Sequence, residues 1–104
     1  MSAHLTTWMS GWRGSLADAQ TTCELLASTL ERAPAEAGRV VLRFPWRPSE
    51  HRDLRRFYDT FVRAGWWPTL WEHDDARCEL TVTAARKGDR ASLIAAWTGQ
   101  EAST

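Results

Sequence analysis

The side chains of this chain that could carry out chemistry are few and mostly scattered. The densest group is His73, Asp74 and Asp75, with Cys78 three residues further on. Imidazole, carboxylate and thiolate groups bind metals, and a Cys–His pair could also serve a thiol enzyme. The spacing matches no standard metal site, however, and a polar hairpin tip needs the same residue types for its turn. We therefore predict no metal and no cofactor. A small enzyme with a site near His73 and Cys78 is the weakest of three functional hypotheses.

The two cysteines, Cys23 and Cys78, point to no thiol chemistry. They form neither a C-x-x-C pair nor a disulfide framework. Strand alternation places Cys78 with Leu80 and Val82 on a core-facing side, where an apolar environment makes a thiol inert. No glycine-rich phosphate loop is present either. We expect no catalytic residues and two reduced thiols in a cytoplasmic protein, because the first residues lack the pattern of a secretory signal.

Tryptophan and arginine are the unusual feature of the composition. The chain holds seven tryptophans in 104 residues, and three of them, Trp66, Trp67 and Trp71, fall within six positions. In a regular strand, Trp67 and Trp71 share the face opposite to Trp66. Arg39 and Arg43 of an earlier strand are expected on the same face as Trp67 and Trp71. The pattern predicts an aromatic sheet face flanked by arginines.

Three interpretations of that face remain open. The amino-terminal helix could fold over it and hide the aromatic side chains. Alternatively, the face binds another protein or a second copy, because Trp and Arg are enriched at interface hot spots. In this hypothesis Trp67, Trp71, Arg43 and Arg39 contact the partner. The third interpretation is a single-stranded nucleic-acid platform, with bases stacked on the tryptophans.

A basic stretch bears on the nucleic-acid hypothesis. Residues 39–63 contain seven arginines and three acidic residues, although 13 basic and 13 acidic residues balance over the whole chain. Arg52, Arg55 and Arg56 could therefore contact phosphates. The simpler interpretation is a solvated helix face, with Asp59 pairing with a neighbouring arginine. The leading hypothesis is a small non-catalytic binding domain, accessory, regulatory or inhibitory in role and homodimeric in one version, that binds protein and no membrane.

Local patterns predict the elements that position these residues. A helix should begin at the N-cap Ser15 and end by Ala33, before Pro34. A strand is expected over 39–46, and a second helix follows Ser49 and ends near Gly65. Two strands, 66–73 and 77–86, form a hairpin, and a last helix runs from Asp89 to Gly99.

This order, α-β-α-β-β-α, predicts an α+β two-layer sandwich with a three- or four-stranded mixed sheet. The last strand of the hairpin can insert between the two parallel strands, which gives the split β-α-β layout of ferredoxin-like folds. We expect an N-terminal segment, 1–14, that contributes an extra strand around Thr6 to Met9. A single α+β domain over 15–99 and a flexible tail over 100–104 follow.

Overall fold

The computed structural model describes residues 6–47 and 51–88 of the chain. Six elements follow one another in these residues: β1 (Thr7–Gly11), α1 (Ala19–Glu31), β2 (Arg39–Pro45), α2 (His51–Arg63), β3 (Trp66–Asp74) and β4 (Glu79–Arg86). A strand therefore precedes the first helix, within the segment where an extra strand was predicted. The last predicted helix, 89–99, and the tail, 100–104, lie outside the described residues.

The four strands form one mixed sheet in the order β1-β2-β4-β3. β1 runs parallel to β2, and β4 is antiparallel to both of its neighbours, β2 and β3. β4 thus lies between β2 and β3, as the split β-α-β pattern predicts. The complete ferredoxin-like layout is not confirmed, because β1 comes before α1 and adds a parallel strand at the edge of the sheet.

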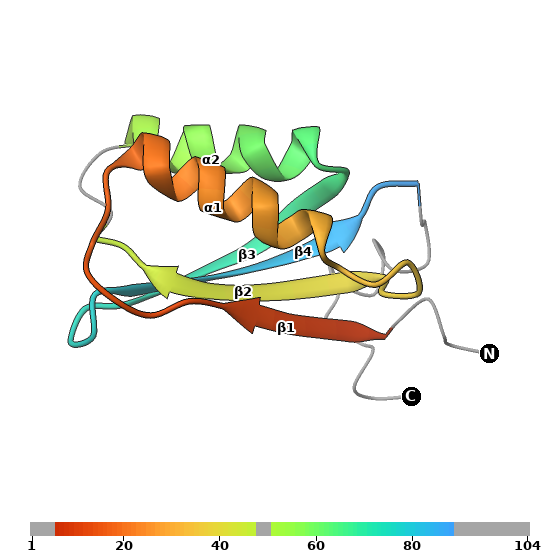
Figure 1. Ribbon diagram of the computed structural model, residues 1–104, viewed down its shortest axis with the longest axis horizontal. Helices are drawn as coiled ribbons and strands as arrows, with labels where there is room; N and C mark the ends of the chain where they lie inside the picture. Colours follow the sequence, from red (N-terminus) through yellow and green to blue (C-terminus); the bar gives the residue numbers. More distant parts are fainter. Residues whose placement is uncertain (1–5, 48–50, 89–104) are drawn as a thin grey trace.

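Both helices lie side by side on one face of the sheet, as Figure 1 shows. Of the three interpretations of the aromatic face, the one in which the amino-terminal helix α1 folds over it is therefore wrong. Its apolar side chains Leu26 and Leu30 are buried in the same core as Val40 and Phe61, so the apolar stripe of α1 is already covered on this side of the sheet. We call the side of the sheet turned away from α1 and α2 the outer face.

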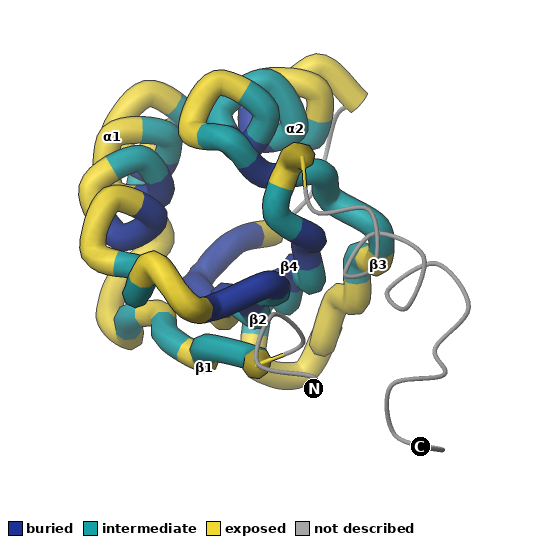
Figure 2. The backbone as a smooth tube through the Cα atoms, turned by 90° about the vertical axis from the view of Figure 1, so that its right-hand side faces the viewer, coloured by how far each residue is buried: buried dark blue, intermediate teal, exposed yellow. Residues whose placement is uncertain are grey.

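The core fills the space between the helix layer and the sheet, where the buried segments in Figure 2 face one another. Period-two alternation along β2 and β4 turns one set of side chains toward the helices. α2 presents Phe57 and Phe61, both fully buried, from its apolar stripe. The ring of Phe44 stacks on Trp12 at 5.1 Å and meets Phe57 edge-on at 5.9 Å.

The N-cap of α1 lies three residues after Ser15, the N-cap predicted from the sequence. Asp18 is the N-cap, and its carboxylate accepts a hydrogen bond of 2.7 Å from the backbone N–H of Thr21. That hydrogen bond favours the charged carboxylate and lowers the pKa of Asp18. Leu16 precedes the helix and is exposed, so it does not belong to the apolar stripe of α1.

Candidate protein-binding face

An irregularity in β3 decides which tryptophans reach the outer face. Trp66 and Trp67 lie opposite Arg86 and Ala85 of β4, but the register shifts between Pro68 and Leu70. One extra residue in a strand reverses the side of every side chain that follows. Proline, which has no N–H to donate to the ladder, is typical of such a position.

The shift corrects the predicted grouping of side chains. Leu70 shares the outer face with Trp67, whereas Trp71 returns to the helix side with Trp66. The ring of Trp71 lies 6.3 Å from that of Phe61, edge to face. Trp71 therefore packs against the core. Of the four residues predicted to contact a partner, Arg39, Arg43 and Trp67 lie together on the outer face, and Trp71 does not.

Among the described residues, Trp67 is the one tryptophan on the outer face. The others are buried or packed against the core on the helix side: Trp8, Trp12, Trp46, Trp66 and Trp71. The indole cluster that stands out in the sequence is thus mainly core. Its largest buried member, Trp66, is 1% exposed and carries the guanidinium of Arg86 over its ring at 4.2 Å.

Three rows of side chains cross the outer face. Cross-strand pairing aligns the residues of each row over all four strands, in the order β1, β2, β4, β3. The central row is Met9, Val41, Thr83 and Leu70. One flanking row is Thr7, Arg39, Ala85 and Trp67, and the other is Gly11, Arg43, Thr81 and Glu72.

The ends of the central row are the most exposed large apolar side chains of this face. Met9 is 70% exposed and Leu70 is 50% exposed. No helix in residues 6–47 or 51–88 covers them, since α1 and α2 lie on the other side. A shallow hollow of about 330 Å³ runs beside Met9 and Val41 toward Arg43. The sequence prediction missed Met9 and Leu70. Alternation with Trp8 could have revealed Met9, but only the bulge exposes Leu70.

Charges of both signs surround the central row. On β2, Arg39 donates from Nε and Nη2 to the hydroxyl oxygen of Thr7, at 3.0 and 2.7 Å. Arg43 is exposed four residues further on. Glu72 ends the row of Arg43 at the β3 edge, and the exposed Asp74 follows it. The β2 side is therefore basic and the β3 side acidic.

The basic residues of α2 do not join this face. Arg52 and Arg55 are exposed in the helix layer, and Arg56 lines the groove between the helices. Arg55 donates to Asp59 at 3.4 Å, which is the helical pairing expected from the sequence. Because the sheet and its core lie between α2 and the outer face, the two sets of arginines cannot contact one nucleic-acid strand segment together.

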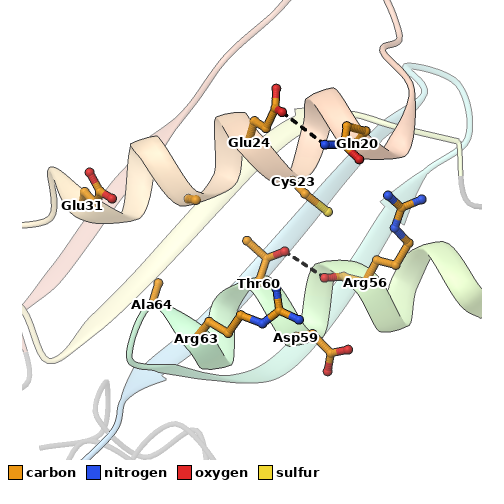
Figure 3. A pocket seen from close by; sticks show the side chains of 10 residues that line it. Gln20, Cys23, Glu24, Glu31, Arg56, Asp59, Thr60, Arg63 and Ala64 are labelled. Carbon is orange, nitrogen blue, oxygen red and sulfur yellow. Dashed lines mark hydrogen bonds between the residues drawn. The ribbon is translucent and has the colours of Figure 1, made fainter.

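A hollow of about 500 Å³ lies between α1 and α2 (Figure 3). Cys23 of α1 points into this groove toward Thr60 and Arg56 of α2. Its α1 wall carries carboxylates, its α2 wall carries guanidinium groups and one carboxylate, and none of its ten lining residues is a histidine. The groove thus offers the thiol no imidazole base for nucleophilic catalysis.

The hairpin tip engages His73 and Cys78 with different partners. His73 Nδ1 lies 2.9 Å from an oxygen of Asp75, and Nε2 lies 3.2 Å from the backbone oxygen of Trp46. The Cys78 sulfur accepts a hydrogen bond from Arg47 Nη2 at 3.2 Å, which raises the pKa of Arg47. In the part of the chain that the structure describes, no three His, Cys, Asp or Glu side chains form a metal-binding group.

The expected burial of Cys78 among Leu80 and Val82 is wrong. Cys78 precedes β4, has a positive φ of 52° and is only half-buried. A residue in that left-handed conformation leaves the alternation of the strand, so its side chain turns to Arg47 rather than to the core.

Comparisons with known proteins match the chain to no family model and to no curated protein. Neither helix in the described residues is long and apolar enough to cross a membrane.

Proposed function

We propose that this protein is a small non-catalytic binding domain that acts by associating with another protein through its outer face. The observation that carries this proposal is the central row, whose ends Met9 and Leu70 are 70% and 50% exposed on a sheet face that neither α1 nor α2 covers. Apolar side chains at the centre and charged ones around them are the usual arrangement of a protein–protein interface. Arg39, Arg43 and Trp67 would contribute its rim.

The charge of this face favours a protein over a nucleic acid. A strand of RNA or DNA presents phosphates along its whole length, and acidic side chains on the binding surface repel them. Glu72 and Asp74 occupy the β3 side of the outer face, opposite the arginines of β2. A partner with charges of both signs satisfies both sides. In residues 6–47 and 51–88, Trp67 is the one tryptophan on the face, which gives fewer stacking platforms than the sequence suggested.

Site-specific photo-cross-linking in the source cell tests this function. A photoreactive benzoylphenylalanine replaces Leu70 on the outer face or, as the matched control, Leu25 on α1, which is 39% exposed. We expect an adduct with a protein chain from position 70 and none from position 25. Equal labelling at both positions would contradict the proposal. The proposal would also be contradicted if position 70 cross-linked only within its own molecule, because the outer face would then be covered by another part of the same chain.

A further inference from the structure

The pattern of charges on the outer face identifies a partner of particular chemistry. Resting on the function proposed above, we infer that the partner is a second copy of this chain, packed face to face about a two-fold axis parallel to the strands. The outer face carries its arginines on the β2 side and its carboxylates on the β3 side. A surface of this kind is complementary to itself when one copy is turned over.

The register of the sheet fixes which residues would meet. Rotation about an axis parallel to the strands keeps each row at the same position along the strand direction and exchanges the two edges of the sheet. β1 of one copy then lies over β3 of the other, so that Met9 packs on the partner's Leu70 and Leu70 on the partner's Met9. These are the two large apolar side chains left most exposed on the face, at opposite ends of one row.

The same rotation pairs the charges. Arg43 would lie over the partner's Thr81, which has the partner's Glu72 and the partner's Arg43 as its two neighbours in one cross-strand row, and the ion pair would form with the partner's Glu72. Two-fold symmetry forms this ion pair twice. In the other flanking row, Arg39 would lie over the partner's Ala85, which has the partner's Trp67 and the partner's Arg39 as its two neighbours.

The size of the face indicates how tight the dimer should be. Three inter-strand spacings give a width of about 14 Å, and packed sheets lie about 10 Å apart. A patch of this width lies near the lower limit for a specific interface, for which we expect a dissociation constant in the micromolar range. Sedimentation equilibrium of the full chain over a wide concentration range measures it directly.

A charge-exchange experiment tests the orientation. Arg43→Glu and Glu72→Arg each place like charges opposite one another in the homodimer, so each variant alone should associate at least about tenfold more weakly. An equimolar mixture of the two should dimerise again, because every contact then joins opposite charges. The control, Arg55→Glu in the helix layer, changes the net charge as Arg43→Glu does and should leave association unchanged.

The outcomes separate this inference from the proposed function. A wild-type chain that stays at 11.8 kDa up to about 1 mM overturns the second copy as partner. If position 70 then still cross-links to a different protein, the binding function stands without the dimer. A dimer that the mixture of variants does not restore overturns the two-fold arrangement. A position-70 adduct at about twice the chain mass, together with association restored in the mixture of variants, supports both the proposed binding function and the two-fold dimer.

Discussion

At the scale of single residues, Gly11 holds β1 against β2. It lies opposite Arg43 in the parallel ladder, and its φ of +151° falls where side chains are rarely accommodated. A Cβ at this position would overlap with the backbone oxygen of Arg43, which also accepts the N–H of Trp12 at 3.1 Å. The glycine therefore permits a backbone approach that the outer face and the Trp12–Phe44 stack both need.

Gly11→Ala should destabilise the domain by about 3 kcal/mol, because β1 must move away from β2 or distort. Gly14→Ala is the matched control. Gly14 also has a positive φ, +138°, but a Cβ there would meet no atom within 4 Å, so the cost should be nearer 1 kcal/mol. Urea unfolding of both variants measures the difference. Equal losses of stability would show that steric overlap at Gly11 contributes nothing.

Asp18 makes α1 sensitive to acid. Its pKa in the folded chain is lowered from 3.8 by the hydrogen bond from Thr21, so the unfolded chain binds the proton more readily. The stabilisation is fully present above the unfolded pKa and is lost as the pH falls through the lower folded pKa.

Asp18→Asn keeps a capping oxygen and should match wild type at pH 7 but lose this pH dependence. Asp18→Ala should lower the melting temperature at pH 7 by a few degrees. Thermal unfolding between about pH 2 and pH 7 compares them. A wild-type profile identical to that of Asp18→Asn would contradict this account.

At the scale of elements, β3 turns one tryptophan inward and its neighbour outward. Trp66 is 1% exposed, whereas Trp67 is only half-buried and has the Lys87 ammonium 4.9 Å from its ring centre. Trp66→Ala should cost about 3–5 kcal/mol by leaving a cavity beneath Arg86. Trp67→Ala should cost much less stability, about 1 kcal/mol, and should instead weaken association. Chemical denaturation and sedimentation equilibrium on the same two variants distinguish these effects. Similar losses of stability would refute the alternation described here.

The elements also show where sequence patterns suffice. β2, α2 and the hairpin were predictable because alternation and an apolar stripe report directly which side is buried. The start of α1 was not, because Ser15 and Asp18 are both good N-caps and only the fold shows which carboxylate or hydroxyl meets a free N–H. The candidate face was predicted in part. Arg39, Arg43 and Trp67 lie on it, but the bulge after Pro68 exchanges Trp71 for Leu70. A bulge depends on ladder hydrogen bonds between strands, which no local pattern specifies.

At the scale of the whole molecule, the two faces of the sheet have different roles. The helix side takes most of the aromatic area and supplies the stability of the domain, with Phe57 meeting the rings of both Phe44 and Trp46 edge-on. The outer face keeps an apolar row that contributes little to the fold of one chain while it is exposed. Substitutions in that row should therefore separate association from folding.

Dimerisation and folding are coupled, which predicts how the melting temperature depends on protein concentration. Only the folded chain can present the outer face, so a dimer should raise the melting temperature as protein concentration increases. For wild type, a hundredfold rise in concentration through the micromolar range should raise the melting temperature by several degrees. The double variant Met9→Ser, Leu70→Ser should melt at the same temperature at all protein concentrations. That temperature should be close to the melting temperature of dilute wild type, because in the single chain Met9 is 70% and Leu70 is 50% exposed. Leu25→Ser in α1 is the control and should keep the concentration dependence of wild type. A double variant that still shows this dependence would place the interface elsewhere, whereas one that melts far below dilute wild type would mean that Met9 and Leu70 stabilise the single chain itself.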